Sequence, residues 1–326
     1  MSEVNLVEAI RMALTRAMEE DPSVLVLGED VGRDGGVFRA TDGLLARFGA
    51  ARVFDTPVSE ALLAGLAVGL GAQRFRPVVE FQFEGFMYPA VDQLVCHAGR
   101  LRNRTRGRLS CPIVLRAPYG GGIKAPEHHS ESPEAYYAHI PGIRVVIPSS
   151  PRAAYGLLLA AIRDPDPVVF LEPKRIYRAP KEPLADDGEA LPLDHCFVVR
   201  EGGDLTLVSW GALLGDALET ADLLAGEGIE AAVIDVATLK PLDRETVLAS
   251  VARTGRCVIA HEAPRTGGFG AEIAAVLAEE GLFSLLAPVQ RVTAPDVPVP
   301  LPRLEPHYLP GTAAILAAAR GAVSYR

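Results

Sequence analysis

The sequence lacks the cysteine patterns that mark structural metal sites and disulfide frameworks. Its four cysteines are spread over 326 residues and never form a Cys-x-x-Cys pair, so we expect reduced thiols. Basic residues are also in the minority, since 32 lysines and arginines stand against 41 aspartates and glutamates, giving a net charge of -9. A nucleic-acid binder needs a basic face to neutralise phosphates. We therefore expect proteins and small molecules as partners, and no nucleic acid.

Long apolar runs are absent as well. The first ten residues contain no basic stretch followed by an apolar one, and no later window is apolar and charge-free over the length of a bilayer span. These absences predict a soluble cytoplasmic protein without a membrane anchor. Aromatic residues make up only 6% of the chain although hydrophobic residues make up 49%, so Ala, Val and Leu must build most of the core.

The common cofactor and hydrolase motifs are missing too. No Gly-x-Gly-x-x-Gly opens a helix after a strand, and no phosphate-binding Gly-x4-Gly-Lys is present. The sequence also contains no His-Glu-x-x-His and no Gly-x-Ser-x-Gly. Because these motifs are absent, the sequence shows no recognisable dinucleotide or NTP site and no signature of a zinc protease or a serine hydrolase.

What the sequence does contain is a regular alternation of apolar strands and helices, which predicts βαβ units and parallel sheets covered on both faces. In the first half, helices are predicted over 3–20, from Ser59, over 87–101 and over 155–162, and strands over 24–30, 53–58, 77–83, 112–118, 144–150 and 167–173. In the second half, strands are predicted over 205–211, 231–239, 257–263 and 289–295, and helices over 217–228, from Asp243 and after 267–270.

Between the two halves, residues 178–195 are rich in proline and charge and show no periodicity, as is typical of a linker. We therefore predict two doubly wound α/β domains with mainly parallel sheets. The first covers residues 1–180, the linker 181–195, and the second, smaller domain 196–326.

One helix start stands out. Ser59 can cap the predicted helix and Glu60 begins it, while Gly65 and Gly69 leave one side of the helix nearly bare. Glycine weakens a helix, so this spacing indicates the close approach of another backbone. Taken alone, Glu60 is most simply a surface acid favoured by the helix dipole.

Glu60 acquires a second interpretation because it opens the pattern Glu-x4-Gly-apolar-x-x-Gly, which thiamine-diphosphate enzymes share. Further segments, in order, resemble the beta subunits of thiamine-diphosphate-dependent 2-oxo acid dehydrogenases, with the branched-chain type closest and pyruvate dehydrogenase also similar: LVLGEDVG, FDTPVSE, EFQF, YPAVDQ, RAPYGGG, HHSESPEAYYAHIPGIRVVIPSSP, AIRDPDPVVFLEPKRIYR and LEPHYLPG. The stretch from His129 to Arg178 is the most specific. The resemblance covers most of the chain and implies a transketolase-like pyrimidine domain followed by a transketolase C-terminal-like domain.

The resemblance assigns roles to individual residues. It implies that Glu60 hydrogen-bonds the aminopyrimidine ring of thiamine diphosphate, and that the ring of Phe86 stacks on that heterocycle. The remaining cofactor-binding residues that it implies are Glu29, Val58, Ser59, Gln82, Met87, Tyr88 and Pro89. The substrate is expected to contact Phe83, Glu84, Gly85, Phe86 and His129.

Three histidines differ in the roles expected for them. A lone histidine in a loop is more often inert than catalytic, but the resemblance places His129, not His128, opposite the 2-oxo acid and the lipoyl group. His129 would orient the substrate and supply a proton to the lipoyl sulfur. His261 stands at a strand end before Glu262, and nothing in the family makes it catalytic, so we interpret it as structural.

The sequence contains no Gly-Asp-Gly, the motif with which single-chain thiamine enzymes hold magnesium and the diphosphate. We therefore expect an alpha subunit to supply the magnesium ligands, in an α2β2 heterotetramer. Relatives of the branched-chain type also bind potassium in the region of Ala161, Asp164 and Asp166, where a solvated loop is an equally good interpretation.

Together these features predict the beta subunit of a 2-oxo acid dehydrogenase, an oxidoreductase of a multienzyme complex. It would catalyse oxidative decarboxylation of a 2-oxo acid, branched-chain by resemblance, and reductive acylation of the lipoyl domain of a dihydrolipoyl acyltransferase core. A pyruvate or acetoin dehydrogenase beta subunit is the enzymatic alternative. A non-catalytic assembly protein of the same fold is the other, against which the presence of both Glu60 and His129 argues.

Overall fold

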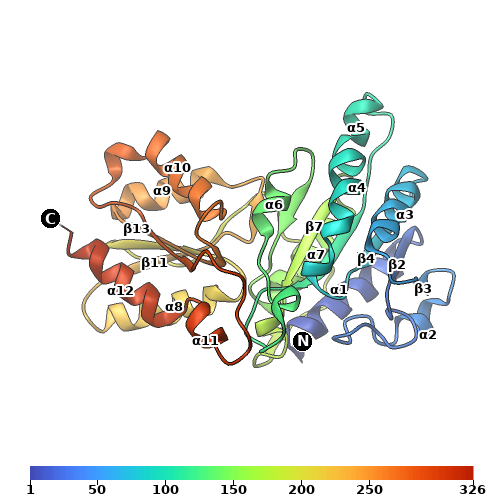
Figure 1. The fold of residues 1–326 in the computed structure, drawn as a ribbon, viewed down its shortest axis with the longest axis horizontal. Coiled ribbons are helices and arrows are strands. Elements are labelled where there is room, and N and C mark those ends of the chain that lie inside the picture. Colours follow the sequence, from blue (N-terminus) through green and yellow to red (C-terminus); the bar gives the residue numbers. More distant parts are fainter. Residues whose placement is uncertain (326) are drawn as a thin grey trace. The chain divides into compact units, whose positions relative to one another are not determined.

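The computed structural model describes residues 1–325 and divides into two compact α/β units (Figure 1). Unit 1 comprises residues 1–119 and 136–193, whereas unit 2 comprises residues 120–135 and the chain from Asp194 onward. The predicted fold class is confirmed, since both units are built on mainly parallel sheets. The loop of residues 120–135 belongs to unit 2, whereas the prediction included it in the first domain, 1–180. Main-chain N–H groups of this loop donate to the carboxylates of Glu262 and Glu305, which are far along the chain.

In unit 1 a parallel sheet has the strand order β6-β7-β5-β4-β2-β3. Its strands are β2 (Val24–Gly28), β3 (Val53–Asp55), β4 (Arg76–Glu80), β5 (Val114–Tyr119), β6 (Arg144–Val146) and β7 (Val168–Pro173). The helices are α1 (Leu6–Glu20), α2 (Leu44–Phe48), α3 (Glu60–Ala72), α4 (Val91–Cys96), α5 (Leu101–Arg104) and α7 (Pro151–Arg163), with α6 (Glu134–Ala138) at the division between the units. A short antiparallel pair joins β1 (Ser2–Val4) to β8 (Glu182–Leu184).

The register of this sheet brings acidic strand ends to one edge. Gly28 pairs with Asp55 on one side and with Glu80 on the other. The approach is close, because a Cβ added at Gly28 would lie 2.4 Å from the main-chain oxygen of Glu80. The residue that follows Gly28 therefore emerges beside the residues that follow β3 and β4.

The helix predicted over 87–101 is interrupted. The chain instead forms short 3-10 turns η1 (Glu84–Phe86), η2 (Tyr88–Ala90) and η3 (Ala98–Arg100) around α4 and before α5. Pro89 lies in the turn that precedes α4, and His97 leaves the helical region with φ of -127°. Gly99 follows in a crowded position, where an added Cβ would lie 2.6 Å from the carbonyl oxygen of Pro141.

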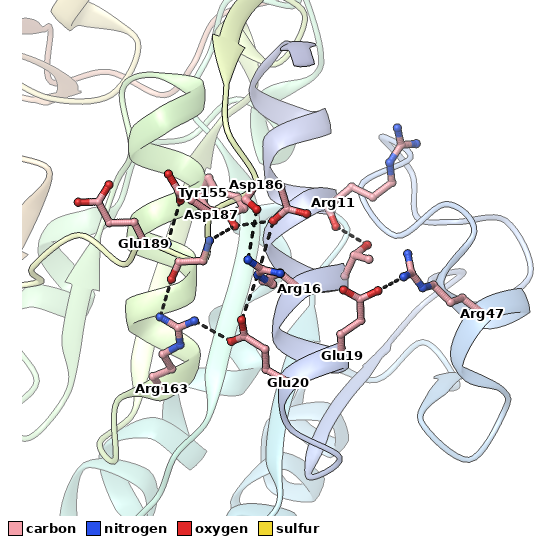
Figure 2. A network of polar contacts seen from close by, with 12 residues as sticks. Arg11, Arg16, Glu19, Glu20, Arg47, Tyr155, Arg163, Asp186, Asp187 and Glu189 are labelled. Atoms are coloured by element: carbon pink, nitrogen blue, oxygen red, sulfur yellow. Dashed lines mark hydrogen bonds and ion pairs between the residues drawn. The ribbon is translucent and has the colours of Figure 1, made fainter. Parts of the chain in front are cut away.

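The stretch predicted as a linker follows a defined path along unit 1 (Figure 2). Tyr155 on α7 donates its hydroxyl to Asp186 at 2.6 Å and accepts the N–H of Gly188 at 2.9 Å. Arg163 donates to the carbonyl of Gly188 at 3.0 Å and to Glu20 of α1 at 2.8 Å. This polar network holds the stretch after β8 on helices α1 and α7, which pack against each other.

A fully buried charge cluster crosses the centre of the unit 1 sheet. The guanidinium of Arg116 on β5 donates to Glu172 on β7 at 2.7 Å and 2.9 Å, and it also pairs with Glu80 on β4. The hydroxyl of Tyr177 donates to Glu172 at 2.5 Å. Burial, more than the neighbouring charge of Glu172, raises the pKa of Tyr177 well above its ordinary value. The cluster links three adjacent strands of the sheet, and its member Glu80 ends β4 at the edge that carries the acidic residues.

Unit 2 has a second sheet, in the order β14-β13-β10-β11-β9, in which only β9 is antiparallel to its neighbour. Helices α8 and α12 cover one face of this sheet and α9 and α10 the other (Figure 1). The elements are η4 (Glu127–His129), β9 (Phe197–Arg200), β10 (Leu205–Ser209), α8 (Leu213–Ala225), β11 (Ala231–Asp235), β12 (Thr238–Lys240), α9 (Arg244–Thr254), β13 (Cys257–Pro264), α10 (Gly270–Glu280), η6 (Leu282–Ser284), β14 (Gln290–Ala294), α11 (Glu305–Tyr308) and α12 (Thr312–Val323). Leu, Val and Ala side chains form its core between β10, β13, α8 and α12. Across residues 1–325, no helix has both the length and the apolar character that crossing a membrane requires.

Candidate active site

Two carboxylates meet at the edge of the unit 1 sheet. Glu29 directly follows β2 and is only 3% exposed, whereas Glu60 begins α3 and is half-buried. Burial raises the pKa of Glu29, and the negative charge of Glu60 raises it further. A hydrogen bond from the main chain of Ser59 acts in the opposite direction. A carboxyl group in this setting is suited to holding a proton that an ordinary glutamate would lose.

The same edge contains two buried polar atoms that lack a partner within the part of the chain that the structure describes. Among the described residues, neither Glu29 Oε1 nor Thr56 Oγ1 has a hydrogen-bond partner. Thr56 follows β3, and its N–H donates to the carbonyl of Gly28 at 2.9 Å. Buried polar groups are normally paired, so these two oxygens fit a polar ligand that enters from outside the chain. Sequence reasoning missed Thr56, although it stands in the quoted segment FDTPVSE.

The start of α3 differs in detail from the sequence expectation. Ser59 occupies the N-cap position, but its side chain makes no cap hydrogen bond. The main-chain N–H of Ser59 instead donates a hydrogen bond to Glu29, and its carbonyl accepts the N–H of Leu63 at 2.9 Å. The preceding Val58 is 78% exposed.

Gln82 joins this group from the segment after β4. Its amide donates to the carboxylate of Asp30 at 3.0 Å. Asp30 has a left-handed φ of 59°, a conformation that is uncommon for a residue other than glycine and is concentrated at functional sites. Asp30 is a further site residue that the sequence analysis did not single out, although it directly follows Glu29.

Aromatic rings follow along the same segment. The ring of Phe83 makes edge contacts with Phe86 at 5.8 Å and with Phe38 at 5.6 Å between centroids. Gly85 and Met87 are buried, Pro89 is exposed, and Tyr88 lies 6.3 Å from the ring of Tyr136. Glu84 is fully buried and accepts the hydroxyl of Tyr137 at 2.7 Å. Because α3 packs against η2, this segment belongs to the same part of unit 1 as Glu60.

The side of α3 that carries Leu62, Leu66 and Gly69 is open to solvent. Leu62 is 52% exposed and Leu66 36% exposed, and a Cβ added at Gly69 would meet nothing within 4 Å. Gly65 faces the side chain of Gln93 instead, at 3.4 Å from the position of such a Cβ. The helix that begins with Glu60 therefore presents exposed apolar residues beside the acid pair.

His129 belongs to unit 2, whereas the two acids and the aromatic segment belong to unit 1. It ends the short turn η4 and is half-buried, with its N–H donating to the carbonyl of Pro126 at 2.9 Å. His128 is mainly exposed and lies 3.8 Å from Glu131. The structure thus places the predicted site residues in two groups, one in each unit.

His261 is completely buried in unit 2 and stacks on Trp210, with centroids 5.1 Å apart and an interplanar angle of 12°. Burial lowers its pKa to about 4, and the positive charge of Arg291 contributes to the shift. Gly268 and Gly270 lie so close that an added Cβ at either would be 2.6 Å or 2.7 Å from the imidazole. A neutral ring enclosed in this way fits the structural role expected for it.

At the turn after α7, both acidic side chains predicted for potassium are engaged by arginines. Asp164 pairs with Arg144 at 3.0 Å, and Asp166 with Arg102 at 2.7 Å. Within residues 1–325, no cluster of three or more His, Cys, Asp or Glu side chains is arranged to hold a metal ion.

The fold is that of a known class. Residues 2–180 match the family model of the transketolase pyrimidine binding domain, and residues 194–315 match that of the transketolase C-terminal domain. A solved structure described as a split gene transketolase, inactive beta4 tetramer, has a TM-score of 0.82 and 26% identity, and the match covers 99% of each chain. These matches define a chain of the two-domain transketolase class.

Sequence relatives narrow the class. The pyruvate dehydrogenase E1 component subunit beta of Acholeplasma laidlawii is 47% identical over 95% of both chains. The mitochondrial 2-oxoisovalerate dehydrogenase subunit beta 2 of Arabidopsis thaliana is 50% identical over 99% of this chain and 90% of its own. The chain belongs to this family of 2-oxo acid dehydrogenase beta subunits.

Proposed function

We propose that this chain is the beta subunit of a thiamine-diphosphate-dependent 2-oxo acid dehydrogenase, active only with an alpha subunit. The observation that carries the proposal is the Glu29 and Glu60 pair, with Glu29 buried, its pKa raised and one of its oxygens without a partner among the described residues. The pair stands in a chain that shares 47% and 50% identity with two such subunits.

Thiamine diphosphate, when bound, supplies a carbon nucleophile that attacks the carbonyl of a 2-oxo acid. Glu60 would hydrogen-bond the ring nitrogen of the aminopyrimidine and share a proton with it, and Glu29, whose pKa is raised by burial and by the charge of Glu60, would be the protonated acid beside it. Phe86 would stack on the heterocycle, with Val58, Ser59, Gln82, Met87, Tyr88 and Pro89 lining the remainder of the site. The unpartnered oxygens of Glu29 and Thr56 support this assignment, because both are ready to pair with a polar ring.

The substrate side of the proposal uses different residues. Phe83, Glu84 and Gly85 precede the stacking ring and would border the bound 2-oxo acid. His129 would orient the acid and donate a proton to the lipoyl sulfur during reductive acylation, which is a later step than cofactor activation. Changing His129 to alanine should therefore slow acyl transfer to a lipoyl domain and leave hydrogen exchange at cofactor C2 near normal.

The proposal requires partner chains. The sequence lacks Gly-Asp-Gly, so magnesium and the diphosphate would be held by the alpha subunit. The exposed face of α3, with Leu62, Leu66 and the open Gly69, would be covered in an α2β2 heterotetramer. A dihydrolipoyl acyltransferase core would accept the acyl group. Potassium would bind at the turn of Ala161, Asp164 and Asp166, where both aspartates also pair with arginines.

The test is to produce the chain with and without an alpha subunit of a 2-oxo acid dehydrogenase. We expect weak thiamine diphosphate binding and no turnover for the chain alone, and turnover with the alpha subunit on pyruvate, 3-methyl-2-oxobutanoate or 2-oxoglutarate. A preference for 3-methyl-2-oxobutanoate would establish the branched-chain type. Tight magnesium-dependent cofactor binding by the isolated chain would overturn the two-subunit proposal. An assembled but inactive complex would favour the non-catalytic alternative.

A further inference from the structure

Two buried carboxylates of unit 2 hold the glycine loop that leads to His129. Glu305, at the start of α11, accepts the N–H of Gly122 at 2.9 Å and that of Lys124 at 2.9 Å, one with each carboxylate oxygen. Glu262, in β13, accepts the N–H of Gly121 at 3.2 Å. Both acids are almost completely buried, at 4% and 5% exposure. A carboxylate bound by main-chain N–H groups makes strong, directional hydrogen bonds.

The backbone conformations and close neighbours of the three glycines favour glycine at these positions. Gly120 and Gly122 have left-handed φ values of 81° and 92°, which other residues adopt only with strain. A Cβ added at Gly120 would lie 2.5 Å from a carboxylate oxygen of Glu262, and one added at Gly121 would lie 2.9 Å from the side chain of Leu309. Larger residues at Gly120 or Gly121 would therefore push the loop away from Glu262 and Leu309.

Further hydrogen bonds within the loop connect the backbone of these glycines to that of His129. The N–H of Gly120 donates to the carbonyl of Glu131 at 3.0 Å, which closes the base of the loop. Inside it, the hydroxyl of Ser130 donates to the carbonyl of Ala125 at 3.2 Å, and the N–H of His129 bonds to Pro126. A loop fixed at its base, at its glycines and next to the histidine leaves few backbone positions for His129.

We propose that Glu305 is a positioning residue for His129, with Glu262 as the second anchor of the same loop. The inference rests on the proposed function, because it assumes that His129 acts in acyl transfer. Glu305 accepts hydrogen bonds from main-chain N–H groups of the loop, and it would act only through the position that the loop gives to the imidazole of His129.

The first measurement does not depend on catalysis. Hydrogen–deuterium exchange of the full chain follows the amides of Gly122 and Lys124 in wild type, Glu305→Gln, Glu305→Asp and the control Glu279→Gln. Glu279 is an exposed acid of α10 in the same unit. We expect the amides of Gly122 and Lys124 to exchange roughly tenfold or more faster in Glu305→Gln. The substitution replaces one carboxylate oxygen, a charged acceptor, with an NH2 group, which cannot accept a hydrogen bond from the loop. Glu305→Asp should restore part of the protection and the control should match wild type. Unchanged exchange in Glu305→Gln would overturn the proposal.

The second measurement uses the enzyme assembled with its alpha subunit. Acyl transfer to a lipoyl domain is compared with decarboxylation coupled to an artificial electron acceptor. We expect Glu305→Gln to slow the first far more than the second, and the double variant Glu305→Gln/His129→Ala to be no slower than His129→Ala alone. Additive losses, or equal losses in both assays, would overturn the positioning role and leave the proposed function standing.

The two proposals can fail separately. If His129→Ala leaves both steps unchanged, the role of His129 fails and the functional half of this inference fails with it, whatever the exchange data show. If Glu305→Gln does not fold, Glu262→Gln replaces it in both measurements, with loss of Gly121 protection and the same step-selective defect as the expected result.

Discussion

The negative charge of Glu60 raises the pKa of Glu29, adding to the larger effect of burial. Glu29 therefore binds its proton more tightly in the folded chain than in the unfolded chain, where its pKa is near the ordinary 4.5. Its contribution to stability is complete below that ordinary value and is lost as the pH rises through the higher, folded-state pKa. The acid pair thus costs the fold free energy at neutral pH, as is expected where function constrains a site.

Glu29→Gln should make the chain more stable than wild type at pH 8, because glutamine cannot ionise. The difference should shrink as the pH is lowered toward 4.5, and thiamine diphosphate binding by the assembled enzyme should weaken. Urea denaturation at a series of pH values measures the first effect, with Glu3→Gln, an exposed acid of unit 1, as the control. A constant difference across the pH range would show that the change acts through packing.

Glu60→Gln keeps the size of the side chain but removes its ability to accept a proton. We expect the assembled enzyme to lose a factor of about 100 to 10,000 in rate, as is typical when a general acid-base group is removed. Hydrogen exchange at C2 of bound thiamine diphosphate is the direct measurement, and it should slow in parallel. Wild-type exchange in this variant would assign cofactor activation to another acid.

Arg116→Met should destabilise unit 1 by roughly 3–5 kcal/mol, because it leaves the buried carboxylates of Glu80 and Glu172 without their counter-charge. The surface pair of Arg152 with Glu189 provides the matched control, since both side chains are more than half exposed, at 55% and 59%. Arg152→Met should cost about 0–1 kcal/mol. Denaturant titration of both variants gives the comparison, and equal losses would mean that the buried cluster contributes no more than a surface pair.

His261→Phe should remove one component of acid sensitivity. The folded-state pKa of His261 is lowered from 6.5 to about 4, so the unfolded chain takes up a proton that the folded chain refuses between these values. Wild-type stability should therefore fall by up to roughly 3 kcal/mol as the pH drops from 6.5 to 4. The variant should show a smaller fall, whereas His195→Gln, at an exposed histidine, should behave as wild type. Identical pH profiles for His261→Phe and wild type would exclude His261 as the source.

Local patterns were enough to predict part of the site. The apolar run of β2 followed by Glu29, and the helix opened by Glu60, could be predicted because strand and helix periods are visible within a few residues. Thr56 and Asp30 could not be predicted in this way, because their importance comes from the register that places Gly28 beside Asp55 and from the left-handed turn after Glu29.

Other features depended on distant parts of the chain. Pro89 gave a local signal that the helix over 87–101 would be interrupted, but the contact of Gly99 with Pro141 gave none. The charge cluster of Arg116 was equally hidden, since its partners lie on other strands. The assignment of the glycine loop to unit 2 rests on acids in β13 and α11, which no pattern near the loop reveals.

The anchoring of Gly122 by Glu305, 183 residues later, also sets an order of events during synthesis of the chain. A ribosome that adds about 5–20 residues per second takes roughly 10–40 s to travel from one residue to the other. During that interval the growing chain already contains the acid pair and the histidine, but the carboxylate that accepts the N–H groups of Gly122 and Lys124 has not yet been made. A nascent or truncated chain without Glu305 would therefore carry every predicted catalytic residue but lack one of the two anchors of the loop that leads to His129.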